Sequence, residues 1–205
     1  MIKHIIFLCL LLFCSFSTRA AIETRWEHPD YKQRMDKREI LSFVEISKTP
    51  QGQHFQIEAE GKTNVSAERA MRALWSEKCW EKYIPTIHKL RALRSSPDKK
   101  IIFIEASILR LYWLRSVMMA HRPRGNESFQ WEFIKGDFAG MKGGITLTPE
   151  KGTRVHARAT LLRSEIDIPQ FIIKFALGFA LRQAGWSLRK VMESGTNDSC
   201  LTSSS

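Results

Sequence analysis

Strand-like patterns recur over eight short segments between residues 40 and 163, and in several of them hydrophobic and polar residues alternate, which is the period of β-strands with one buried face. In one of them, Phe55, Ile57 and Ala59 alternate with Gln, Glu and Glu. Turn-forming Pro, Gly, Asn and Asp residues separate most of the segments. The pattern predicts strands at 40–46, 54–63, 87–94, 100–108, 112–122, 128–135, 140–148 and 153–163.

Helical patterns interrupt and end this series of strands. Ser66 is a favourable N-cap for a helix that begins at Ala67, and a second short helix is expected from Glu77 to Tyr83, before Pro85. A longer helix is expected at 170–193. The predicted order is two strands, two short helices, six antiparallel strands and one long helix. This order indicates an α+β protein in which the last helix covers one face of the sheet.

The helix at 170–193 is apolar on two sides. At 100° per residue one stripe faces the expected sheet, and it contains Ile173, Leu177, Leu181, Ala184, Leu188 and Val191. Aromatic residues lie on the other side among cations. A helix of this kind covers its own sheet with one face, and the second face contacts a ligand, a membrane surface or the N-terminal segment of the chain.

The N-terminus has the layout of a secretory signal peptide. Basic Lys3 and His4 precede an apolar run at 5–13, and small residues Thr18 and Ala20 occupy the positions of a cleavage site. We expect export, to the periplasm in a bacterium and otherwise by secretion, with an uncleaved anchor as the alternative. The predicted organisation is a signal peptide at 1–20, an N-terminal extension with an extra strand at 21–52, one domain at 53–193 and a disordered polar tail at 194–205.

Composition adds information about partners and compartment. The first twenty residues hold two basic and no acidic residues, so the remaining chain keeps +9 of the formal charge of +11. This positive excess favours anionic partners. No nucleic-acid-binding motif is present, so nucleic acid is not expected to be a partner. Once Cys9 and Cys14 leave with the signal peptide, Cys79 and Cys200 remain. An oxidising compartment permits a disulfide between them, and the position of Cys200 in a Ser-rich tail argues against it.

Several short stretches resemble the START-like, helix-grip superfamily, nearest to its polyketide cyclase/dehydrase and coenzyme Q-binding proteins. They are VSAERA at 65–70, WEKYIP at 80–85, FIKGD at 133–137 with MKGG at 141–144, and Ile168-Pro169 before the last helix. The resemblance covers roughly residues 53–193. It implies a curved antiparallel sheet that grips the long helix, with an apolar cavity between them for a lipid or quinone-like molecule.

Large side chains on the expected strands and helix are candidates for lining that cavity. They are Phe103, Trp113, Met119, Trp131 and Phe133 from strands and Ile173, Leu177 and Leu181 from the helix. Glu105 and Arg115 share strand parity with Phe103 and Trp113, so they are candidates for holding a ligand's polar end. The alternatives are that the apolar residues are plain core and that the two charged residues are solvated or paired. A register slip of one residue would reverse every assignment.

Enzymatic activity is the second hypothesis for function. The histidines are scattered singly, and no metal-ligand spacing, nucleophile elbow, phosphate loop or Cys-Xaa-Xaa-Cys pair is found, so no metal or cofactor is expected. Some members of the superfamily act as cyclases with few polar residues, so a cyclase/dehydrase activity stays open.

A surface module is the third hypothesis. Aromatic and basic residues on the outer side of the last helix are typical of a helix that lies on anionic lipid. They are Phe171, Phe175, Phe179, Trp186, Arg182 and Arg189. The alternative is that residues 21–50 fold over these aromatic side chains.

Overall fold

The computed structural model describes residues 26, 28–108, 112–123, 125, 127–163, 170–193 and 200; within these, the side chains of 108, 112, 163, 170–173 and 176 are not described. The predicted signal peptide and most of the predicted disordered tail lie outside the described residues. The contacts divide the chain into two compact units, 1–39 and 40–205. Each is described by itself.

The first unit contains one described helix of two turns, α2 (Pro29–Asp36). His28 caps it, because its Nδ1 accepts a hydrogen bond from the backbone N–H of Asp30 at 3.3 Å, and Pro29 occupies the first turn, where a missing N–H costs nothing. The helix lies within the predicted extension at 21–52.

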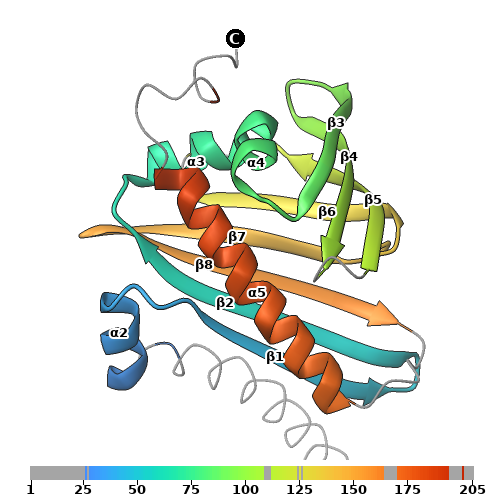
Figure 1. The fold of residues 1–205 in the computed structure, drawn as a ribbon, viewed down its shortest axis with the longest axis horizontal. Coiled ribbons are helices and arrows are strands. Elements are labelled where there is room, and N and C mark those ends of the chain that lie inside the picture. Colours follow the sequence, from blue (N-terminus) through green and yellow to red (C-terminus); the bar gives the residue numbers. More distant parts are fainter. Residues whose placement is uncertain are drawn as a thin grey trace, which may run out of the picture. The chain divides into compact units, whose positions relative to one another are not determined.

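The second unit is built on one antiparallel sheet of eight strands (Figure 1). The strands are β1 (Leu41–Thr49), β2 (Gly52–Thr63), β3 (Ile87–Ser95), β4 (Lys99–Ile108), β5 (Tyr112–His121), β6 (Ser128–Gly136), β7 (Lys142–Glu150) and β8 (Gly152–Arg163). Their order across the sheet is β1-β2-β8-β7-β6-β5-β4-β3. All eight lie within three residues of their predicted bounds, and the predicted extra strand before residue 52 is β1.

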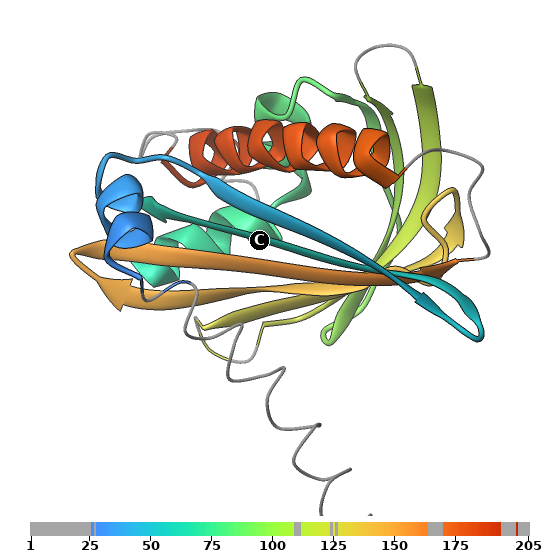
Figure 2. The same ribbon diagram turned by 90° about the horizontal axis from the view of Figure 1, so that it is seen from below.

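The described residues of this unit form three helices: α3 (Ala67–Trp75), α4 (Glu77–Tyr83) and α5 (Gln170–Glu193). Figure 2 shows that the sheet is curved and that α5 runs along its concave side, with β3, β4 and β5 rising beside the helix. The α+β, helix-grip architecture and the two short helices after β2 are therefore confirmed.

Local chemistry explains where these elements begin and turn. Ser66 caps α3, because its Oγ accepts from the backbone N–H of Arg69 at 3.3 Å. The β1–β2 turn closes at Gly52, whose φ of 128° suits glycine. At the end of β6, Gly136 has φ 95° and lies so close to the backbone of Arg115 that a Cβ would be 2.0 Å from its carbonyl oxygen. Glycine is therefore required there.

The C-terminal end of α5 is bonded to the start of α3 and the end of β2. Glu193 Oε1 accepts from Thr63 Oγ at 3.0 Å and from the Asn64 backbone N–H at 3.2 Å, and Arg69 Nε donates to the Met192 carbonyl at 3.4 Å. Val191 and Met192 are buried in the same region. These contacts fix the helix across the sheet.

A disulfide joins Cys79 in α4 to Cys200 in the C-terminal tail. Both cysteines are buried, and Ser76 Oγ donates to the Cys200 carbonyl at 2.7 Å. The expectation that this disulfide would not form is wrong. The polar, Ser-rich composition around Cys200 gave no sign that the residue itself packs against α4, which is a tertiary contact.

The two faces of α5 are arranged as predicted for the side chains that the structure describes. Leu177 and Leu181 pack against the core beneath the helix, and Val191 is fully buried. Phe175, Phe179 and Trp186 are 73%, 41% and 51% exposed. Strand β1 lies beside α5, where Ser42 Oγ donates to the Gly178 carbonyl at 3.3 Å, but it does not bury these three aromatic side chains. The side chains of Phe171 and Ile173 lie outside the described residues.

Candidate functional site

A cavity of about 320 Å³ lies between the concave face of the sheet and helices α4 and α5. Strands β4 to β8 form most of its floor, Ile57 of β2 and Ile87 of β3 add to it, and α5 contributes Leu181, Ala184 and Leu188. Trp80 on α4 and Ile84, the residue that follows α4, also line the cavity. Its volume is at the lower end of the range of about 300–1,000 Å³ that is usual for small-molecule sites.

The cavity lining is almost wholly apolar. Ser116 is one of its few polar side chains, and its Oγ already accepts from the Phe138 backbone N–H at 3.2 Å. Arg158 also borders the cavity, but its side chain is 52% exposed and its Nε donates to Glu58 Oε1 at 3.2 Å. The lining therefore offers a ligand hydrophobic contact and very little polar contact.

Three of the residues predicted from sequence line the cavity: Trp131, Phe133 and Leu181. Leu177 packs one turn earlier on α5, against the core cluster that includes Trp131 and Phe133. The side chain of Ile173 is not described. The sequence therefore indicated the β6 and α5 sides of the cavity correctly.

The β4 and β5 candidates lie on the opposite face of the sheet. Residues that line the cavity from these strands are Ile104, Ala106, Leu114, Ser116 and Met118. Phe103, Glu105, Trp113, Arg115 and Met119 alternate with them and therefore face the convex side. Their predicted place in the cavity is wrong. Both strands have apolar residues on both faces, so their sequence pattern did not decide which face is buried.

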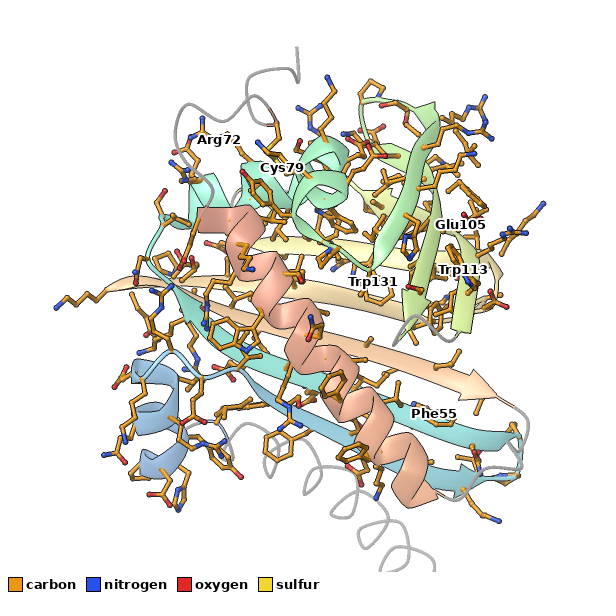
Figure 3. The ribbon with its side chains drawn as sticks, in the orientation of Figure 1. Phe55, Arg72, Cys79, Glu105, Trp113 and Trp131 are labelled. Carbon is orange, nitrogen blue, oxygen red and sulfur yellow. A yellow bond between two sulfur atoms is a disulfide. The ribbon has the colours of Figure 1, made fainter. Side chains whose placement is uncertain are left out.

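The two charged candidates pair with each other instead of holding a ligand. Glu105 and Arg115 are register partners, and Arg115 Nε donates to Glu105 Oε2 at 2.7 Å. The Arg115 side chain is 71% exposed. Figure 3 labels Glu105 and Trp113 on these strands. Of the alternatives of a solvated or a paired residue, the structure shows the pair.

Sequence reasoning missed the contribution of α4 and of small residues. Trp80 packs edge-to-face on Phe129 with ring centroids 6.2 Å apart, and both residues line the cavity. Gly143 makes room for Trp131, because a Cβ at this position would lie 2.4 Å from Trp131 Cζ2. The signal that could have found them was the tryptophan in a short helix next to the strands and the Gly143-Gly144 pair inside a strand.

The convex face above β2 and β8 has a different chemistry. Glu58 and Glu60 are buried there and form ion pairs with Arg158 and Arg154. His156 lies on the same face of β8, and burial lowers its pKa below 6.5, with Glu58 acting to raise it and the two arginines acting to lower it. Of these ionisable residues, Glu58, Glu60, Arg154 and His156 are not part of the cavity lining.

In the described part of the chain, no group of three or more His, Cys, Asp or Glu side chains is placed to hold a metal ion. None of the helices in this part combines the length and the apolar character needed to cross a bilayer.

No family model and no curated protein matches the chain in sequence. Solved structures match it in fold. A STAR-related lipid transfer protein fragment from Xanthomonas axonopodis matches with a TM-score of 0.55 and 12% identity, over 73% of this chain and 98% of that one. The ZhuI aromatase/cyclase from Streptomyces sp. R1128 matches with a TM-score of 0.54 and 12% identity, over 68% and 92%. Human STARD10 matches with a TM-score of 0.54 and 11% identity, over 73% and 72%.

This chain has the START-like helix-grip fold. The similarity agrees with the fold that the sequence resemblance implies: a curved sheet, two short helices and a long last helix. At these identities the likeness concerns the fold, so function has to be argued from the cavity itself.

Proposed function

We propose that this START-like protein binds a hydrophobic or amphipathic small molecule in the cavity between the sheet and α5, for transport or sequestration. One observation carries the proposal: a space of about 320 Å³ whose walls are almost entirely apolar side chains. Leaving such a space empty forfeits the dispersion contacts that close packing would provide, and a hydrocarbon ligand restores them.

Binding is favoured over the cyclase/dehydrase alternative by the side chains around the cavity. Among the described lining residues there is no His, Asp, Glu, Lys, Cys or Tyr, and the guanidinium of Arg158 is paired with Glu58. A general acid or base has to reach the reacting atoms within hydrogen-bond distance. The fold itself is compatible with either role, since its neighbours include a lipid transfer protein and an aromatase/cyclase.

Native mass spectrometry of the protein purified without detergent tests the proposal. We expect a bound small molecule that is released on denaturation. An Ala157→Phe variant fills the cavity from β8 and should lose the ligand, while Thr146→Phe adds the same ring to an exposed position on β7 and should keep it. An empty wild-type protein that also fails to take up any added lipid or quinone would refute binding, and turnover of an aromatic polyketide would favour an enzyme.

Contact with an anionic membrane surface is a second part of the proposal. It is supported by three exposed aromatic side chains on α5, Phe175, Phe179 and Trp186, next to exposed Lys174 and Arg182. Arg189 does not belong to this surface, contrary to the sequence-based prediction. It is buried, and its guanidinium lies 4.9 Å from the centroid of the Trp186 ring.

Vesicle co-sedimentation tests the membrane contact. A Phe175→Ser, Phe179→Ser variant should bind phosphatidylglycerol vesicles at least about tenfold more weakly, because each exposed ring would lose apolar burial worth about 1.5–3 kcal/mol. Leu162→Ser changes a side chain that is 50% exposed on β8 and serves as the control. Equal vesicle binding by the double variant and the wild type would remove the membrane from the proposal.

We also propose export to an oxidising compartment. The Cys79–Cys200 disulfide supports it, since such bonds persist in periplasmic and secreted proteins and are rare in the cytosol. Mass spectrometry of the protein from its native compartment should find a chain that begins at Ala21 and contains no free thiol. A chain that retains residues 1–20 and two reduced cysteines at 79 and 200 would contradict the proposal.

A further inference from the structure

Most of the described polar groups that border the cavity have partners inside the protein. Most of the floor comes from inner strands of the sheet; β8, for example, is paired with β2 over residues 153–163 and with β7 over residues 152–160, so most of its backbone N–H and carbonyl groups are used in the two ladders. Ser116 Oγ accepts the Phe138 N–H and keeps its own O–H as a donor, and Arg158 binds Glu58. A ligand polar group inside the cavity would find few groups with which to exchange its hydrogen bonds to water.

Trp80 carries a second donor close to the cavity. Its indole N–H has no hydrogen-bond partner among the described residues, but Nε1 is itself buried within the packing around α4. The N–H is therefore not presented at the cavity surface, although the ring lines the cavity.

We infer that the cavity takes up a compact, uncharged hydrocarbon group and that any polar end of the ligand remains outside it. This inference rests on the proposed function and specifies its ligand. Burial of a hydroxyl without a hydrogen bond costs about 1–3 kcal/mol in proteins, and an ionised carboxylate or phosphate costs far more. A volume of about 320 Å³ also limits the enclosed group to a compact one.

A pair of neutral probes of equal chain length tests this inference. Decan-1-ol can leave its single hydroxyl at the opening, whereas decane-1,10-diol has to bury one. Displacement of a fluorescent fatty-alcohol probe should give a dissociation constant for the diol at least about tenfold higher than for decan-1-ol, because about 1.4 kcal/mol corresponds to a factor of ten.

Three variants separate the buried hydroxyl from a general difference in hydrophobicity. Ala157→Ser places a hydroxyl in the lining and should lower the ratio of the dissociation constant of the diol to that of decan-1-ol. Thr146→Ala removes an exposed hydroxyl from the opposite face and should leave the ratio unchanged. Trp80→Phe keeps an aromatic ring but removes the N–H, and should also leave the ratio unchanged.

The possible failures are distinguishable. Equal affinity for both alcohols, or loss of diol binding in Trp80→Phe alone, would show that the cavity does supply a polar partner and would overturn the inference. A co-purified ligand with both alcohols rejected would refute this ligand class while leaving the binding role intact. The absence of any bound molecule in the mass spectrum would instead refute the proposed function.

Discussion

The concave and convex faces of β4 and β5 are made by alternating residues of the same two strands, and their chemistry is opposite. On the concave face Ile104, Leu114 and Met118 surround an apolar cavity. On the convex face the Glu105–Arg115 ion pair lies beside Trp113, which is 60% exposed and whose ring centroid is 4.6 Å from that of His88. The difference teaches that a large side chain on a strand is not by itself evidence for a ligand site. What decides is the face against which the helix packs.

Substitution of a buried residue on the concave face should have the largest effect. Met118 is 2% exposed, so Met118→Asp removes its packing and buries a carboxylate, and we expect a loss of about 5 kcal/mol or more. Urea unfolding followed by circular dichroism measures it. Trp113→Ala, five residues away on the convex face, should cost less than about 1 kcal/mol. Similar losses for both variants would show that the two faces do not differ as described.

The convex face carries both a buried and an exposed ion pair. Loss of the buried pair should lower the free energy of unfolding more than loss of the exposed pair. Glu60 has a side chain that is 1% exposed and pairs with Arg154, which is 20% exposed. Glu60→Ala removes this partner and leaves Arg154 the longer contact to Glu150 at 3.9 Å, so we expect a loss of about 3 kcal/mol in the free energy of unfolding. Chemical denaturation gives the value, and a double variant Glu60→Ala, Arg154→Met should recover part of it. A loss near zero for Glu60→Ala would contradict the burial of this pair.

His156 should make the convex face sensitive to pH. Burial lowers its pKa from 6.5 in the folded protein, so the unfolded chain takes up a proton at a higher pH than the folded one. The stabilising contribution of the neutral ring is complete above pH 6.5 and is lost as the pH falls below that value. The free energy of unfolding should therefore decrease between pH 7.5 and 5.5, and the decrease should be smaller in His156→Asn. An equal decrease in the variant would assign the effect to other groups.

The smallest effect is expected at the exposed ion pair. Glu105→Gln removes the charge partner of Arg115, whose side chain is 71% exposed, and should cost less than about 1 kcal/mol. Ligand affinity should not change, because both residues face away from the cavity. A fall in ligand affinity after this substitution would show that Glu105 takes part in binding, and it would contradict the assignment of the ligand site to the concave face.

The sequence predicted the cavity-lining residues correctly on some strands and incorrectly on others. In β6, the aromatic residues Phe129, Trp131 and Phe133 alternate with polar neighbours, so their common face was clear, and Trp131 and Phe133 do line the cavity. In β4 and β5, apolar residues occupy both parities, and every candidate chosen there was on the wrong face. The contribution of Trp80 depends on where α4 packs, which no periodic pattern encodes.

The sequence by itself determined the order of the elements, their approximate bounds and the two-faced character of α5, because these follow from local periodicity, turn residues and caps. The tertiary structure alone decided which face of β4 and β5 is concave, that Cys200 reaches Cys79, and that Glu105 binds Arg115. Each of these depends on contacts between residues far apart in the chain or across strands. The amino-acid pattern of a single segment is compatible with more than one such arrangement.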